Sequence, residues 1–287
     1  MTLHHPGACV FVPDGLPAGA ALARTTHLGI GAHADDLEFM ALHGIAACHG
    51  STAEWFGGVT CTDGAGSVRT GRFADLSDAE LRAVRHREQE QAAQVGGYGV
   101  MVQLGHASTA ACNPRDPALR EDLTAILRAA HPRVVYTHNL ADKHRTHVAV
   151  AVAALRAIRA LPRGERPEAV YGCEVWRGLD WMLDTDKIYQ DVSGHAVLAA
   201  LLIGAFPSQI EGGKRYDLGV VGRRATNATF GDPHAADDAS QTCLAMDLTP
   251  LAHDDTLDVV AYVDSYIERF REDVRARLRT CLGKEVD

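Results

Sequence analysis

One short segment of the chain, Gly29–Glu38, holds the side chains with the clearest potential for chemistry: His33, Asp35 and Asp36. A neutral imidazole and a carboxylate spaced three residues apart can share one divalent ion, and zinc accepts both kinds of ligand. Asp35 lies between these two residues and would be free to act on a metal-bound water. In the purely structural alternative, Asp35 caps a helix and Asp36 interacts with the helix dipole. A second cluster of ligands would favour the metal site.

The same segment also matches the dinucleotide-binding pattern G-x-G-x-x-A through Gly29, Gly31 and Ala34. In proteins with that pattern, a pyrophosphate binds at the N-terminus of the following helix. Asp35 and Asp36 would occupy this position, and their negative charge would repel the phosphates. The sequence therefore favours a metal over a nucleotide at this turn.

A second cluster follows about a hundred residues later and contains His138, Asp142, His144 and His147. His144 and His147 repeat the three-residue spacing, again between an expected strand and an expected helix. Three protein ligands with an open fourth position are typical of catalytic zinc. The alternative is a histidine-rich loop exposed to solvent, and the presence of two such junctions in one sheet makes it the weaker interpretation.

Strand and helix patterns alternate along the chain and would bring these two junctions together. Buried strands are expected at 27–32, 54–62, 99–105, 133–138, 169–176 and 187–192, and helices at 35–49, 78–95, 117–130, 144–161, 195–206 and 256–282. This alternation predicts an α/β fold with a doubly wound, mostly parallel sheet and helices on both faces. In such a sheet, sites form at the carboxyl ends of the strands.

One domain is expected over residues 1–287, with a core at about 25–210 and C-terminal elaborations at 211–287. Residues 212–242 are expected to form a long loop. The last helix has an apolar face of five residues and is expected to dock on the fold: Val259, Tyr262, Val263, Tyr266 and Phe270.

Composition narrows the classes of function. The chain has 287 residues, with 28 Lys+Arg against 37 Asp+Glu and a formal net charge of −9. This acidic balance argues against binding to nucleic acid or to anionic lipid. The seven cysteines are scattered and odd in number, as expected for free thiols in a reducing compartment. The N-terminus lacks a signal-peptide pattern, and the longest apolar stretch, 196–206, is too short to span a bilayer. A cytoplasmic protein without membrane partners is therefore expected.

The motifs resemble those of the PIG-L/LmbE-like zinc-dependent N-deacetylase family. Ala32–Glu38 is similar to the family's A-H-P-D-D-x-E signature, and His144–His147 to its H-P-D-H motif. Arg85–Glu88 resembles its R-x-x-E helix, and Ser208-Gln209 its later S-Q element. The resemblance covers roughly residues 25–210. It implies a Rossmann-like fold and removal of N-acyl groups, mostly from amino sugars and their conjugates.

The resemblance also implies a role for each matching residue. Zinc would be held by three ligands: His33, Asp36 and His147. Asp35 would be the general base that activates the zinc-bound water, and His144 would polarise the amide carbonyl. Arg85 would hold a sugar hydroxyl or a phosphate of the substrate.

The chain departs from the family pattern at several positions. Ala34 replaces a proline, and Arg145-Thr146 replaces Pro-Asp, which removes the carboxylate that normally orients the catalytic histidine. Asp142 is expected to replace this carboxylate as the partner that orients the histidine. The loop after the second strand lacks the glutamate of related deacetylases, and Asp63 is expected to contact the substrate there.

Together these features predict a metal-dependent hydrolase that removes an N-acetyl group from a small substrate, an N-acetylglucosamine-type amino sugar or glycoconjugate. Zinc is the expected cofactor, with another divalent metal as an alternative. Two alternative functions stay open: a zinc hydrolase of another amide or ester, and a Rossmann nucleotide-binding protein without hydrolytic activity. The sequence leaves the oligomeric state open, with a homo-oligomer as one option.

Overall fold

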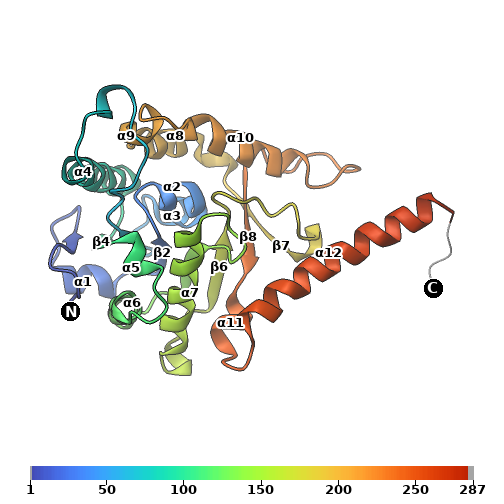
Figure 1. Cartoon of the computed structure of the whole chain (residues 1–287), viewed down its shortest axis with the longest axis horizontal. Coiled ribbons are helices and arrows are strands. Elements are labelled where there is room, and N and C mark those ends of the chain that lie inside the picture. The colour runs from blue at the N-terminus through green and yellow to red at the C-terminus, as the bar shows by residue number, and fades with distance from the viewer. Residues whose placement is uncertain (1, 284–287) are drawn as a thin grey trace.

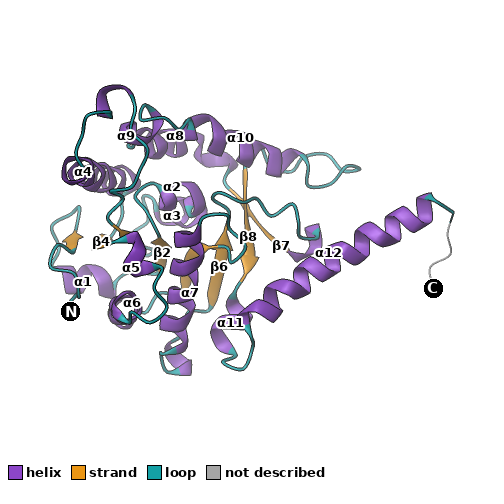
Figure 2. Ribbon diagram, in the orientation of Figure 1, coloured by secondary structure: helices purple, strands orange, loops and turns teal. Residues whose placement is uncertain are grey.

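The computed structural model describes residues 2–283, in which a central eight-stranded sheet is covered by helices (Figures 1 and 2). The strands are β1 (Cys9–Phe11), β2 (His27–Gly31), β3 (Phe56–Thr62), β4 (Val100–His106), β5 (Val134–His138), β6 (Ala169–Cys173), β7 (Lys187–Asp191) and β8 (Thr242–Asp247). Their order across the sheet is β1-β4-β3-β2-β5-β6-β8-β7.

The sheet is mostly parallel, as predicted. Strands β4, β3, β2, β5 and β6 run parallel to one another, whereas β1 is antiparallel to β4, and β8 is antiparallel to both β6 and β7. His27 of β2 is paired with Val134 of β5, so the two strands run in step. The segments that follow β2 and β5 therefore leave the sheet at the same edge, which brings the two predicted clusters together.

The helices cover both faces of the sheet, which confirms the predicted fold class. Their bounds are α1 (Ala18–Ala23), α2 (Asp36–Met40), α3 (Leu42–Cys48), α4 (Asp78–Gly96), α5 (Ser108–Ala111), α6 (Ala118–Ala130), α7 (Arg145–Arg159), α8 (Ala196–Gly204), α9 (Pro207–Ile210), α10 (Tyr216–Thr229), α11 (Thr249–His253) and α12 (Val259–Cys281). Helices α1, α6, α7 and α11 pack on one face, and α2, α3 and α8 on the other. Among the described residues, none of these helices is long and apolar enough to cross a membrane.

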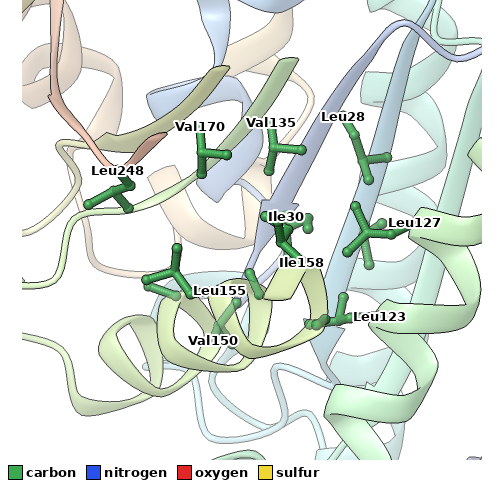
Figure 3. Close-up of a cluster of buried hydrophobic side chains, with 14 of the residues drawn as sticks. Leu28, Ile30, Leu123, Leu127, Val135, Val150, Leu155, Ile158, Val170 and Leu248 are labelled. Atoms are coloured by element: carbon green, nitrogen blue, oxygen red, sulfur yellow. The ribbon is translucent and has the colours of Figure 1, made fainter. Parts of the chain in front are cut away.

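The larger core cluster lies between the sheet and helices α6 and α7 (Figure 3). Ile30, Val135 and Val170 project from three neighbouring strands toward Leu127 and Ile158 of these helices, and all five side chains are fully buried. Residues alternate between the two faces of a strand, so Gly29 and Gly31 face the opposite side, toward α2.

The two glycines of the dinucleotide-like pattern have a packing role. A Cβ atom built at Gly29 would lie 2.9 Å from Leu37 Cδ2 of α2 and 2.8 Å from Phe56 Cζ. A Cβ at Gly31 would lie 3.1 Å from Asp36 Cβ. Only glycine allows α2 to approach β2 this closely. The pattern is therefore explained without a nucleotide.

Two predicted elements are wrong in detail. The single helix predicted at 35–49 is broken at Ala41 into α2 and α3, and Asp35 itself is not helical. Both pieces bury apolar residues in the same cluster, so their periodicity resembles that of one continuous helix. The predicted loop at 212–242 contains α10, which begins at Tyr216. Tertiary contacts hold this helix: the Arg224 guanidinium donates to the carbonyl oxygens of Glu38 and Phe39 at 2.8 and 3.0 Å.

The C-terminal region completes the sheet and then leaves it. Strand β8 inserts between β6 and β7, and the first half of α12 packs on the larger core through four residues: Val259, Tyr262, Val263 and Tyr266. The Tyr262 hydroxyl donates to the Asp247 carbonyl oxygen at 2.7 Å. The predicted docking is therefore confirmed for this half, whereas the second half of α12 extends away from the body of the molecule (Figure 1).

The Ile158→Ala variant tests the importance of the α7 interface. Removing this fully buried side chain leaves a cavity and should lower the free energy of unfolding by about 2–5 kcal/mol. Urea denaturation followed by circular dichroism measures the loss. Arg156→Ala, an exposed position on the same helix, should change the stability by less than about 0.5 kcal/mol. An equal effect of the two variants would contradict the described packing.

Candidate active site

The turn after β2 is held in an unusual backbone conformation. Asp35 has φ of 88°, in the left-handed region that residues other than glycine rarely adopt. Two side chains of α4 support it: the Asp35 backbone N–H donates to Gln89 Oε1 at 3.2 Å, and Arg85 donates to the Ala34 carbonyl oxygen at 2.5 Å. Arg85 also lies 3.4 Å from the Asp35 carboxylate. A strained backbone of this kind persists only where several surrounding contacts hold it in place, as Arg85 and Gln89 do here.

Helix α4 acts as the support of this turn. A capping box between Ser77 and Glu80 begins the helix, and its buried face carries Arg85, Glu88 and Gln89. Glu88 accepts hydrogen bonds from the backbone N–H and the hydroxyl of Ser208, at 2.7 and 2.5 Å. The Arg85–Glu88 and Ser208-Gln209 motifs of the sequence therefore join α4 to α9.

Three potential metal ligands converge where β2 and β5 end. His33 Nδ1 lies 3.2 Å from His147 Nε2 and 3.3 Å from Asp36 Oδ2, and His147 Nε2 lies 3.5 Å from Asp36 Oδ1. A tetrahedral zinc ion with bonds of about 2.0–2.1 Å places its ligand atoms about 3.3 Å apart. Each imidazole thus lies near one of the two Asp36 oxygens, and the spacing between the three side chains fits such an ion.

His138 is a neighbour of this group that the sequence motifs left without a role. Its ring is fully buried, stacks on His147 at 3.9 Å between centroids, and lies 3.3 Å from Asp36 Oδ2. Asp36, His138 and His147 form a geometrically feasible ligand group, as do His33, His144 and His147. However, His138 Nε2 accepts a hydrogen bond from the Ala32 backbone N–H at 2.9 Å, so its lone pair is already used. His33 is therefore the better third ligand.

The two adjacent carboxylates have opposite electrostatic environments. Burial alone would raise the pKa of Asp36, but the rings of His147 and His138 hold it well below its ordinary value. Burial raises the pKa of Asp35 well above its ordinary value, against the effect of Arg85, and Asp36 adds to the increase. Carboxyl pairs whose pKa values are driven apart in this way are typical of sites that divide charge stabilisation from proton transfer.

The second cluster orients its histidines through Asp142 and the start of α7. Asp142 Oδ1 lies 3.5 Å from His147 Nδ1 and accepts from the His144 backbone N–H at 2.8 Å. Burial would raise the pKa of Asp142, but these two partners lower it to about 2. The His144 ring itself is oriented by the Thr146 backbone N–H, which donates to Nδ1 at 3.3 Å. Asp142 thus contacts the ring of His147 and only the backbone of His144.

These groups open into a cavity of about 500 Å³. His33, Asp35, Asp36, His144 and Arg85 all line it, so the structure brings most of the predicted site residues together. Asp63 instead lines a neighbouring cavity, where its carboxylate accepts from Arg82 Nη1 at 3.3 Å. The substrate contacts assigned to Arg85 and Asp63 remain predictions.

Three further residues of the cavity wall come from outside the motifs: Trp176, Lys214 and Tyr216. The Trp176 ring lies 6.5 Å from that of His144 and 6.2 Å from that of Tyr216, and Lys214 Nζ lies 5.0 Å from its centroid. Trp176 is the last residue of the strand predicted at 169–176, and such a position at the carboxyl end of a strand is a usable signal for a site. Lys214 and Tyr216 lie in the segment predicted to be a loop, and no sequence pattern marks them.

The fold and this group of side chains define an α/β protein with a candidate His/Asp metal site at the carboxyl edge of its sheet. Residues 28–158 match the model of the PIG-L family, described as GlcNAc-PI de-N-acetylase. This match confirms the predicted resemblance to the family over residues 28–158. No curated protein matches the chain in sequence.

Solved structures share the fold at low sequence identity. The A40926 pseudoaglycone deacetylase Dbv21 is 18% identical, with a TM-score of 0.56, and the match covers 78% of this chain and 97% of that one. The N,N'-diacetylchitobiose deacetylase from Pyrococcus horikoshii is also 18% identical, with a TM-score of 0.55 and coverage of 77% and 83%. GalB, a 4-carboxy-2-hydroxymuconate hydratase from Pseudomonas putida KT2440, is 17% identical, with a TM-score of 0.57 and coverage of 78% and 96%.

The Asp142→Asn variant tests the support of His147. Losing the carboxylate beside Nδ1 should weaken binding of zinc by about 10–100-fold, as for other partners of metal-binding histidines. Competition with a chromophoric chelator measures the affinity. Asp116→Asn, in an exposed turn, is the control and should leave it unchanged. An unchanged zinc affinity in Asp142→Asn would contradict the role of Asp142 in supporting His147.

Proposed function

We propose that the protein is a zinc-dependent N-deacetylase that hydrolyses the acetamide of an N-acetylglucosamine-type amino sugar or glycoconjugate. The observation that carries this proposal is the arrangement of His33, Asp36 and His147 at ligand spacing, with Asp35 and His144 on the wall of the same cavity. Another divalent metal is the alternative cofactor.

The residues present fit a divalent cation. The donor set is one carboxylate and two imidazoles, which is the chemistry of catalytic zinc sites. The Asp36 carboxylate lies beside the rings of both His33 and His147. A cation held there would polarise the amide carbonyl and make the attacking water more acidic. Everything else in the reaction is the work of this chain's side chains.

Asp35 is suited to move protons. Its carboxylate is buried on the cavity wall, and its raised pKa makes it a stronger base than an exposed aspartate. It would take a proton from the attacking water and return it to the amine nitrogen as the C–N bond breaks, which yields acetate and a free amine. Arg85, 3.4 Å from its carboxylate, would position it through this cycle.

His144 is suited to stabilise the oxyanion. Burial and the neighbouring ring of His147 lower the pKa of His144, so the ring is neutral near pH 7. Because the Thr146 backbone N–H donates to Nδ1, the neutral ring carries its proton on Nε2. That N–H can donate to the carbonyl oxygen as negative charge develops on it.

The cavity supports a sugar-sized substrate. Trp176 and Tyr216 give it aromatic walls beside His144, and Lys214 and Arg85 supply cationic donors for hydroxyl groups. Two of the solved structures that share the fold are named as deacetylases, one of N,N'-diacetylchitobiose and one of the A40926 pseudoaglycone. This comparison supports an amino-sugar substrate.

The alternatives differ in what the activated water attacks. GalB has a similar fold and is a hydratase, so the same architecture accommodates reactions other than amide hydrolysis. An ester or another amide would be attacked by the same groups. A nucleotide-binding function is the least supported, because Asp35 and Asp36 lie where the phosphates would bind.

The proposed setting of the enzyme is the cytoplasm, with a small molecule as its partner. The seven cysteines are all unpaired thiols, as expected in a reducing compartment. The net charge of −9 argues against nucleic acid as a ligand.

The Asp35→Asn variant tests the proposed mechanism. Replacing the base with an amide should lower kcat by about 10²–10⁴-fold, while zinc remains bound because the ligands are intact. Acetate release and elemental analysis of the same sample measure both properties. His147→Ala should instead lose the metal, and Asp75→Asn, at an exposed position, should lose neither. A fully active Asp35→Asn enzyme would overturn the mechanism.

A substrate panel tests the proposed class. The zinc-loaded enzyme should release acetate from N-acetylglucosamine, its oligomers or its glycosides, with a free amine appearing in equal amount. Simple esters, other amides and unsaturated dicarboxylates serve as the competing classes. Turnover confined to one of these classes would replace the deacetylase assignment while keeping the metal site.

A further inference from the structure

A second group of potential metal ligands lies outside the cavity. Cys9 of β1 and His86 and Glu90 of α4 each present one ligand atom, and these atoms all lie within 4.8 Å of one another. All three side chains are half-buried. None of them contributes to the mechanism above.

The fold explains why these residues meet. Cys9 is paired with Gln103 across the antiparallel β1–β4 ladder, and directly paired residues share one face of a sheet. Gln103 Nε2 donates to the His86 carbonyl oxygen at 3.1 Å, so that face is the one covered by α4. His86 and Glu90 are one helical turn apart, with Nδ1 and Oε1 separated by 3.6 Å.

The donor set indicates which cation would bind. A thiolate and an imidazole select zinc and similar transition metals, whereas magnesium and calcium require oxygen ligands. The His86 and Glu90 side chains are 36% and 28% exposed, so an ion has access and a water molecule can complete a tetrahedron. The thiolate and carboxylate charges together balance a divalent ion.

We propose that Cys9, His86 and Glu90 form a second zinc site that fastens the edge strand β1 to helix α4. Strand β1 has only three residues and lies at the end of the sheet, so an ion here would add a strong cross-link. His86 and Glu90 are the chain neighbours of Arg85 and Gln89. An ion bound to this part of α4 would thus stabilise the helix whose Arg85 and Gln89 hold the Asp35 turn. This site does not depend on the proposed deacetylase activity.

Cobalt loading of the full-length protein tests the second site directly. A cysteine thiolate bound to Co²⁺ gives a near-ultraviolet charge-transfer band, which the nitrogen and oxygen ligands of the first site cannot produce. The apoprotein titrated with cobalt chloride should show this band, and Cys9→Ser should lose it. Cys112→Ser, another half-buried cysteine, is the matched control and should retain it.

Two further variants keep the experiment decisive. His147→Ala should lose the cobalt of the first site and keep the charge-transfer band, which separates the two sites. If Cys9→Ser does not fold, His86→Gln replaces it as the test variant. It should lower the affinity for the cobalt ion that gives the band by at least ~10-fold, because losing a metal ligand costs more than losing a residue that hydrogen-bonds to a ligand. Zinc should also raise the Tm of the native protein more than that of the folded site variant. The absence of the band in the native protein, or its persistence in Cys9→Ser, would overturn the proposal.

Discussion

The structure depends on the burial of two adjacent carboxylates, Asp35 and Asp36, at the carboxyl end of β2. Each is less than 9% exposed, and a buried carboxylate without partners costs several kcal/mol. The surrounding fold compensates each one differently. The β5–α7 junction places His147 beside Asp36, and α4 places Arg85 beside Asp35. The parallel register of β2 and β5 is what allows both groups of partners to reach one turn.

The sequence motifs predicted which side chains meet at this turn better than they predicted the contacts that support them. The spacing of His33 and Asp36, and of His144 and His147, was enough to place four groups at one edge of the sheet, because parallel strands end together. The buried ring of His138 was not assigned, since a single histidine at the end of a strand carries no periodic signal. Asp142 was predicted to orient His144, but a contact with the His147 ring depends on side-chain directions that spacing does not specify.

The fold was predictable where strong periodicity coincided with turn signals. The five parallel strands and the long helices α4, α6 and α7 follow this rule. Helix α10 was not predicted, because Gly219 and Gly222 weaken its local helix propensity. Tertiary contacts such as those of Arg224 stabilise it instead. Strand β1 was missed because it has only three residues. Strand β8 has six residues but was also missed, and both strands gain their stability from a neighbour distant in the sequence.

The fold alone does not determine the reaction, since deacetylases and a hydratase share it. The reaction depends first on which residues hold the metal. Anomalous diffraction at the zinc edge, from crystals of the zinc-loaded protein, tests this claim directly. The account predicts a peak bounded by His33, Asp36 and His147, with His138 remaining hydrogen-bonded to Ala32. A peak coordinated by His138 in place of His33, or no peak at this edge of the sheet, would contradict it.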